Sequence, residues 1–286
     1  MSINNRITII IVLYNSSDLI FNCLKPLDNF NIIIVDNGKN STYLKELEKK
    51  KNVKIITKNK NLGYGCGINF AFEQVKTDFF LILNPDVFIN ESEILKLLNT
   101  AEKYKNCAIA APLNIPDKDS YGVLPEKRSL FEKNISKNNS NKDFQKIKPD
   151  AEICVDVTKG CALLVNSKYF KEVNCFSEKY FLFWEEIDLC RKFLKKKLSI
   201  IVNPSSIAEH KQGKSSQFNL TNFCIRTYHN EISPLYYFAI KKNSPHIYKN
   251  MAKYLFRTIS YLLILNVKNS LKNLLKLSAT IKYICK

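Results

Sequence analysis

Short apolar runs alternate with helical patterns over the first hundred residues. The runs are rich in β-branched and aromatic residues and cover residues 7–13, 32–35, 53–57 and 79–83. Continuous apolar strands of this kind are buried on both faces, as in a parallel sheet with helices on either side. The pattern therefore predicts an α/β fold with a largely parallel sheet.

Regular structure is expected again beyond residue 150. Apolar runs predict strands at residues 153–158, 162–165 and 198–202, and a helix is expected near residues 185–196. The chain then changes character. We expect one α/β domain over residues 1–225 and a helical, basic, amphipathic extension over residues 226–286.

The C-terminal extension combines a leucine-rich stripe with positive charge. Residues 241–286 hold nine lysines and Arg257 but no carboxylate. Lys268, Lys272 and Lys276 recur every four residues, which places them on one helix face. This predicts a basic amphipathic helix on an anionic membrane surface. The alternative is a helical cap packed on the catalytic domain with a solvated lysine face.

Composition and charge narrow the class of protein. With 286 residues, of which 45% are hydrophobic, the chain can bury a sizeable core. Forty-four basic and 26 acidic residues give a formal net charge of +18, which favours an anionic partner. A nucleic-acid-binding protein is disfavoured, because the excess is concentrated in the tail and no known nucleic-acid module is recognised.

The cysteines and the N-terminal residues bear on the cellular compartment. Nine cysteines without a C-x-x-C pair argue against a disulfide framework or a zinc site. A polar start leads directly into an apolar run of about seven residues, too short for a signal peptide or a membrane span. We therefore expect a cytoplasmic location.

Candidate ligand-binding residues follow the predicted strands, because ligands of open α/β sheets lie beyond the carboxyl ends of the strands. Asp86 ends the turn Asn84-Pro85-Asp86 after the run at 79–83. A carboxylate there can hold a divalent cation against a diphosphate. An ordinary proline turn is the alternative.

A glycine-rich segment at residues 61–69 carries three of the seven glycines of the chain. Gly63, Gly65 and Gly67 can let the backbone approach a phosphate or a sugar closely. The alternative is a tight turn from strand to helix. A dinucleotide fingerprint does not fit, because the segment follows the third strand and lacks the last glycine.

Three carboxylates, Glu185, Glu186 and Asp188, follow the aromatic run at 181–184. An apolar wall raises the pKa of a carboxyl group, which suits a general base, but acidic residues are also favoured at any helix start. His210, close to Lys214, follows the last strand and is either a metal ligand or a structural histidine.

Taken in this order, the segments closely resemble glycosyltransferase family 2, which has the GT-A fold, and within it the rhamnosyltransferase-like branch. The resemblance covers residues 6–216. The matching segments are residues 11–16, 34–37, 61–69, 83–87, 160–162, 176–183 and 185–191, with His210, Gly213 and Ser215.

The resemblance implies roles for individual residues. Asp36 would contact the nucleobase beside the backbone of Tyr14, and Asn84 would face the ribose. Asp86 and His210 would hold a divalent metal, Mg or Mn. The remaining residues expected to bind the nucleotide sugar are Asn61, Gly63, Gly67, Asn69, Trp184 and Lys214.

The family carries Glu-Asp or Asp-Asp where this chain has Glu185-Glu186, and the second residue is the catalytic base. Glu186 is therefore the expected base, with Glu185 as the other candidate. The longer side chain of Glu186 reaches about one methylene further than an aspartate.

The resemblance implies an inverting glycosyltransferase. It would move a sugar, rhamnose by analogy, from a nucleoside diphosphate to an acceptor hydroxyl of a lipid-linked surface glycan. Such an enzyme would lie on the inner face of the plasma membrane. The alternative functions are an inactive nucleotide-sugar-binding protein and, less favoured, a nucleic-acid-binding protein.

Overall fold

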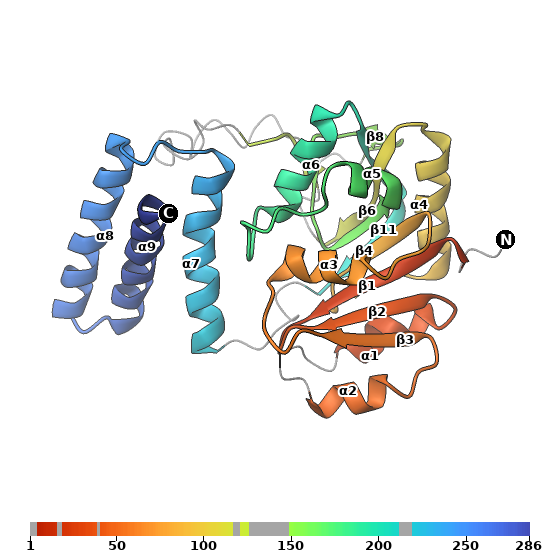
Figure 1. Ribbon diagram of the computed structural model, residues 1–286, viewed down its shortest axis with the longest axis horizontal. Helices are drawn as coiled ribbons and strands as arrows, with labels where there is room; N and C mark the ends of the chain where they lie inside the picture. The colour runs from red at the N-terminus through yellow and green to blue at the C-terminus, as the bar shows by residue number, and fades with distance from the viewer. Residues whose placement is uncertain (1–4, 16–18, 39–40, 117–120, 126–148, 212–218) are drawn as a thin grey trace. The chain divides into compact units, whose positions relative to one another are not determined.

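A computed structural model describes residues 5–15, 19–38, 41–116, 121–125, 149–211 and 219–286 of the chain (Figure 1). The chain divides into two compact units. The first comprises residues 1–124, 142–178 and 185–217, and the second comprises residues 125–141, 179–184 and 218–286. The predicted boundary between residues 225 and 226 lies inside a helix of the second unit.

The N-terminal half of the first unit is the predicted parallel sheet. Strands β1 (Ile7–Leu13), β2 (Asn31–Asp36), β3 (Val53–Thr57) and β4 (Phe79–Leu83) pair in the order β3-β2-β1-β4. All three pairings are parallel, and every residue of β1 and β4 is buried. The prediction from the apolar runs is confirmed here.

The rest of the sheet is mixed. Strand β10 (Ala162–Asn166) runs antiparallel between β4 and β6 (Cys107–Ile115). Strand β11 (Ser199–His210) pairs parallel with β6 and antiparallel with β5 (Val87–Phe88). Two short strands, β8 (Ile153–Cys154) and β9 (Val157–Thr158), replace the single strand expected at 153–158, and β9 pairs with β7 (Tyr121–Gly122).

Helices cover both faces of this sheet. The shorter ones are α1 (Leu19–Leu24) with the 3-10 turn η2 (Lys25–Leu27), α2 (Ser41–Leu47) and α5 (Ser167–Glu172). The others are α3 (Tyr64–Phe72), α4 (Glu91–Lys103) and α6 (Glu185–Lys195). Alternate residues of β1 enter two separate apolar clusters, one shared with α1 and α4 and the other with α3, α5 and α6.

The second unit is built on α7 (Leu220–Tyr237), α8 (Pro245–Leu263) and α9 (Val267–Cys285). Its core includes Ile232, Ile247 and Tyr283. Residues 179–184 belong to this unit, where the ring of Phe181 stacks on His229 with centroids 4.7 Å apart. Among the described residues, none of the helices has the length and apolarity to cross a membrane.

The lysine stripe predicted for the tail is divided by this fold. Lys268 and Lys272 are exposed, whereas the Lys276 ammonium lies 3.3 Å from Oε2 of Glu231 and over the ring of Tyr254. The hydroxyl of Tyr254 donates to the other oxygen of Glu231 at 2.6 Å. Lys276 therefore holds the three helices together and does not continue the exposed row of lysines.

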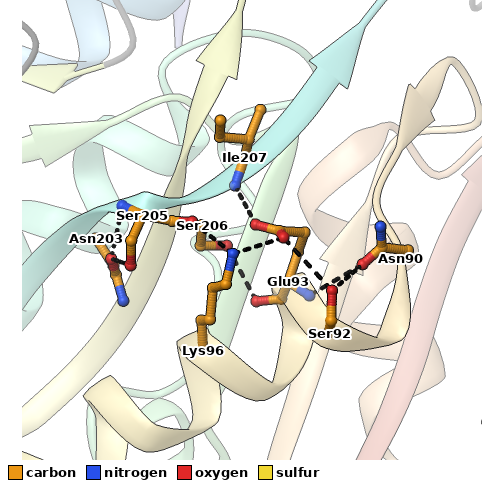
Figure 2. A network of polar contacts seen from close by, with 8 residues as sticks. All are labelled: Asn90, Ser92, Glu93, Lys96, Asn203, Ser205, Ser206 and Ile207. Carbon is orange, nitrogen blue, oxygen red and sulfur yellow. Dashed lines mark hydrogen bonds and ion pairs between the residues drawn. The ribbon is translucent and has the colours of Figure 1, made fainter.

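Strand β11 extends eight residues beyond its predicted end because a network of polar side chains supports an irregularity within it (Figure 2). The pairing of β11 with β6 shifts register between Asn203 and Ile207. The Glu93 carboxylate accepts hydrogen bonds from the Ile207 N–H at 2.7 Å and the Lys96 ammonium at 2.7 Å. Lys96 also donates to the Ser205 carbonyl at 2.8 Å.

Burial alone would raise the pKa of Glu93, but the hydrogen bonds from Lys96 and from the Ile207 N–H lower it overall. The ionised form of Glu93 is therefore favoured in the folded protein. Its charge ties the start of α4 to the shifted segment of β11, which leads to His210 at the end of the strand.

Glu93→Ala should destabilise the protein by about 1–3 kcal/mol in urea unfolding at pH 7, because it leaves the Ile207 N–H without its acceptor. Glu91→Ala is the matched control, since Glu91 is also in the first turn of α4 and has the same favourable position at the helix start. The excess loss for Glu93 should vanish as the pH falls through the lowered folded pKa of this carboxyl. Equal losses for the two variants at all pH values would contradict this assignment.

Candidate active site

The carboxyl ends of β1 and β2 place Tyr14 and Asp36 at the same edge of the sheet. Leu13 and Asp36 are paired in register, and Tyr14 follows directly. The Asp36 side chain is buried, and its Oδ1 accepts a hydrogen bond from the Gly38 N–H at 3.0 Å. The structure thus brings together the two residues expected at the nucleobase.

Asn37, which the sequence did not single out, fixes the glycine-rich segment to this edge. Its side chain is buried, donates to the Gly63 carbonyl at 2.8 Å and accepts from the Leu62 N–H at 3.2 Å. Gly63 has φ of 81°, a left-handed conformation that favours glycine, and its N–H donates to Oδ1 of Asn61 at 2.9 Å. The segment is a tight turn from strand to helix, locked by two asparagines.

Gly67 and Asn69 have packing partners inside the first unit. A methyl group at Gly67 would lie 3.3 Å from the side chains of Asn37 and Val12, so the glycine lets α3 approach β1. The Asn69 amide exchanges two hydrogen bonds with the backbone of Phe176, each of 2.9 Å. These contacts give both residues structural roles, and their contact with a nucleotide sugar stays a prediction.

The two expected metal ligands lie next to each other. Asp86 follows β4 and is only 1% exposed, and His210 ends β11. His210 of β11 pairs with Val87 of β5, and the Lys211 N–H donates to the Asp86 carbonyl at 2.9 Å. This pairing places Nε2 of His210 3.7 Å from Oδ1 of Asp86. Among the described residues, no group of three or more His, Cys, Asp and Glu side chains is arranged to hold a metal ion.

The acidic pair begins α6 in the first unit. Glu185 is 5% exposed, and Glu186 is partly exposed. Two glycines give the pair room, since a methyl group at Gly65 would lie 3.4 Å from Cβ of Glu185, and one at Gly160 would lie 3.2 Å from Cβ of Glu186. Each glutamate has a buried Oε2 with no hydrogen-bond partner among the described residues.

Burial raises the pKa of both glutamates, but it acts more strongly on one of them. The pKa of Glu185 is raised well above its ordinary value, by burial and then by the neighbouring Glu186 carboxylate. Burial also raises the pKa of Glu186, while backbone N–H groups, including that of Ile187, stabilise its anionic form. Each of the two carboxyl groups therefore holds its proton more readily than a glutamate in water does.

Tyr64 links the acidic pair to the turn at Asp86. Its hydroxyl lies 2.7 Å from Oδ1 of Asn84 and donates to the Gly160 carbonyl at 2.8 Å. Burial raises the pKa of Tyr64 well above its ordinary value. Electrostatic interaction with Cys161, Glu185, Glu186 and Asp86, when these groups are ionised, raises it further, so several acidic groups lie near one hydroxyl.

Tyr64 is the principal residue that the sequence analysis missed. The available signal was its place inside the glycine-rich segment, at the first position of α3. That position does not reveal its partners, because Gly160 lies 96 residues further along the chain. The convergence of Asn84, Asp86, His210 and the glutamates around Tyr64 is visible only in the fold.

Two residues expected to bind the donor are not among those that the structure brings together in the first unit. Trp184 belongs to the helical unit, where its ring packs against Tyr237 and Phe238 at centroid distances of 5.1 and 5.4 Å. Lys214, like Gly213 and Ser215, lies outside the described residues. Their contact with the donor stays a prediction.

The raised pKa of Glu185 has a consequence for stability. A carboxyl group with a raised folded pKa retains its proton in the folded state after the unfolded chain has lost it, so stability falls as the pH rises above about 4.5. Glu185→Gln should remove this loss, and the variant should be increasingly more stable than the wild type between pH 5 and 8.

Thermal unfolding at a series of pH values measures this difference. Glu172→Gln, an exposed substitution in α5, controls for the removal of one negative charge. A stability difference for Glu185→Gln that does not change with pH would contradict the raised pKa.

The described fold and the sequence are both similar to known glycosyltransferases. A low-salt glycan biosynthesis hexosyltransferase of Haloferax volcanii is 25% identical over 206 residues, covering 68% of this chain and 63% of that protein. The N-acetylglucosaminyl-diphospho-decaprenol L-rhamnosyltransferase of Mycobacterium tuberculosis is also 25% identical, covering 63% of this chain and 66% of that protein. The chain thus spans about two thirds of the length of each.

The solved structure of a mannosyltransferase from Pyrobaculum calidifontis in complex with GDP-Man and Mn2+ matches 99% of this chain and 74% of its own, with a TM-score of 0.56 and 11% sequence identity. This likeness shows that the two share the GT-A fold. The model of the family described as Glycosyl transferase family 2 matches residues 8–169, more than half of the chain. The chain belongs to glycosyl transferase family 2.

Proposed function

We propose that the protein transfers a sugar from a nucleoside diphosphate sugar to an acceptor hydroxyl with inversion at the anomeric carbon. The observation that carries the proposal is the convergence at Tyr64 of two different kinds of acidic group. Asp86 lies beside an imidazole, which suits a cation, whereas Glu186 lies in an apolar environment at a helix start, which suits a base.

The nucleotide would bind along the carboxyl edge of the parallel strands. Tyr14 and Asp36 would contact the base, and Asn84 would face the ribose. The turn at Asn61 and Gly63 would line the rest of the donor site, together with Gly67, Asn69, Trp184 and Lys214. The names of the relatives favour a hexosyl donor, with rhamnose as the first candidate sugar.

Asp86 and His210 would hold a divalent cation, Mg²⁺ or Mn²⁺. Their chemistry fits, because a carboxylate oxygen and an imidazole nitrogen from different elements lie 3.7 Å apart. Two protein ligands leave the other coordination positions for phosphate oxygens and water. When bound, the cation would neutralise the negative charge that develops on the departing diphosphate.

Glu186 would take the proton from the acceptor hydroxyl. A general base must be ionised when the acceptor arrives, so we assign the charge to Glu186, whose anionic form backbone N–H groups stabilise, and the proton to Glu185. Glu185, neutral, would then lower the electrostatic repulsion between the base and the diphosphate. This division of roles is the reason for preferring Glu186 to Glu185 as the proposed base.

The acceptor would be a lipid-linked glycan precursor at the membrane surface. The mycobacterial relative is named for a decaprenol-linked acceptor, and residues 241–286 carry ten positive charges without a carboxylate. An acceptor of this kind is confined to a membrane, so an enzyme on the inner face of the plasma membrane would meet it directly.

Glu186→Gln should lower transfer by about 10²–10⁴-fold, because the amide cannot accept the proton. Affinity for the nucleoside diphosphate should stay within about twofold, since the variant keeps the size of the side chain. A panel of nucleotide sugars with N-acetylglucosaminyl-diphospho-decaprenol as acceptor measures transfer, and isothermal titration measures affinity. Glu185→Gln is the matched control and should lose less activity. Near-normal turnover of Glu186→Gln would move the base elsewhere.

Nucleoside diphosphates should stabilise the protein against heat only when Mn²⁺ or Mg²⁺ is present, because Asp86 and His210 bind the phosphates through the cation. Asp86→Asn and His210→Ala should each abolish most of the shift in Tm, whereas Glu186→Gln should retain it. A metal-independent shift that survives in both variants would contradict the assignment of these two residues.

A further inference from the structure

The end of α8 and the turn after it expose a cluster of large apolar side chains. Phe256, Leu263 and Leu265 are 72, 78 and 84% exposed. The whole cluster, called here the apolar tip, consists of Leu255, Phe256, Ile259, Leu262, Leu263, Ile264, Leu265 and Val267. A soluble surface carries single exposed leucines without consequence, but a contiguous group of this size marks an interaction surface.

The turn that carries the apolar tip is well ordered by its own backbone. The Leu265 N–H donates to the Leu262 carbonyl at 3.0 Å, and the Asn266 N–H donates to the Tyr261 carbonyl at 2.8 Å. These two bonds form a Schellman motif that ends α8. The Asn266 side chain then accepts from the Asn269 N–H at 3.2 Å and begins α9. The apolar residues are therefore held on a defined turn.

Leu265 does not serve the stability of this turn. Its φ is 56°, in the left-handed region where glycine or asparagine is favoured and leucine is strained. Its side chain has almost no neighbours that would compensate for the strain, since it is 84% exposed. Both the backbone conformation and the exposure disfavour leucine here, so an interaction with something other than this chain would account for it.

Positive charge surrounds the apolar tip. The exposed cations Lys253 and Arg257 lie on α8 beside it, and Lys268 and Lys272 follow it on α9. The carboxylate of Glu231 on α7 faces Tyr254 and Lys276 inside the unit. An apolar surface bordered by cations complements the interface of a membrane that contains anionic lipids.

We propose that the apolar tip inserts into the interfacial layer of an anionic membrane, with Lys253, Arg257, Lys268 and Lys272 on the lipid headgroups. The proposal deepens the proposed action on a lipid-linked acceptor by naming the residues that enter the membrane. A second copy of the chain fits this surface less well, because a symmetric contact would bring the cations of both copies together.

The test uses the full-length protein and vesicles of phosphatidylcholine with about 30% phosphatidylglycerol, which supplies anionic headgroups. Leu263→Asn/Leu265→Asn should lower the partition coefficient in co-sedimentation by about tenfold or more. Leu265→Asn alone should bind less well than the wild type and have an equal or higher Tm, because asparagine relieves the left-handed backbone.

Ile281→Asn is the matched control, since Ile281 is an exposed apolar residue about 24 Å along α9 from Leu265. It should leave partitioning unchanged if only the apolar tip inserts. If Ile281→Asn lowered the partition coefficient as much as the double variant does, the protein would bind by a flat contact along the helices and not by insertion of the apolar tip. That result would overturn the proposal. Undiminished binding by a folded double variant would overturn it as well.

Two further measurements separate this proposal from its alternatives. Sedimentation velocity without lipid should show the same mass for wild type and double variant, and a wild-type dimer that the double variant abolishes would favour a second copy as the occupant. The metal-dependent Tm shift with nucleoside diphosphate should survive in the double variant. Failure of that shift in the wild type would contradict the proposed catalytic function and leave the vesicle result intact.

Discussion

At the start of α6 the buried Glu185 lies beside the partly buried Glu186, and the candidate site depends on this costly arrangement. A buried carboxylate is less stable than one in water, and a second carboxylate beside it raises the electrostatic energy further. Burial raises the pKa of both carboxyl groups, and backbone N–H groups at the helix start partly offset this by stabilising their anionic forms. Gly160 leaves space for Glu186, because a methyl group there would lie 3.2 Å from its Cβ, whereas a methyl group at Gly65 would first meet Phe176, at 3.0 Å.

The backbone directly before this pair is strained. Phe183 and Trp184 both have positive φ, 65° and 72°, at a cost of about 1–2 kcal/mol for each residue. Contacts within the helical unit offset part of this cost. The ring of Trp184 packs on Tyr237 and Phe238, and the Ser233 hydroxyl donates to the Leu182 carbonyl. The chain thus passes directly from an aromatic segment that the helical unit holds in place to the first acidic residue of the site.

The parallel half of the sheet could be predicted from sequence because its strands are apolar runs. Such a run indicates a buried strand without any knowledge of the residues that it packs against. The same criterion ended β11 too early. Pro204, Ser205 and Ser206 break the apolar run. Bonds from Glu93 and Lys96 on α4 support this segment, and β11 then pairs again with β6 and with β5 as far as His210. Strand β6 was likewise not predicted, and it contains Pro112.

The candidate site shows the same division between local and distant information. Asp86, His210 and the glutamates could be proposed from residue type and local position, and the fold brings them together. The choice between Glu185 and Glu186 could not be made from the sequence, because it depends on burial and on how each side chain reaches backbone N–H groups. In the tail, leucine spacing predicted helix but not the break at 264–266, because no glycine or proline marks it and Leu265 itself takes the left-handed conformation.

The hydroxyl of Tyr64 has only one proton to donate, and this explains why an amide side chain suits position 84. The hydroxyl lies within hydrogen-bond distance of both Asn84 and the Gly160 carbonyl but can donate to only one of them. The amide of Asn84 can turn its NH₂ group to the phenolic oxygen, so that Tyr64 accepts from Asn84 while it donates to Gly160. An aspartate at position 84 would offer only acceptors and would add another negative charge beside Asp86 and the glutamates. An asparagine there lets the hydroxyl satisfy both neighbours and adds no charge to the site.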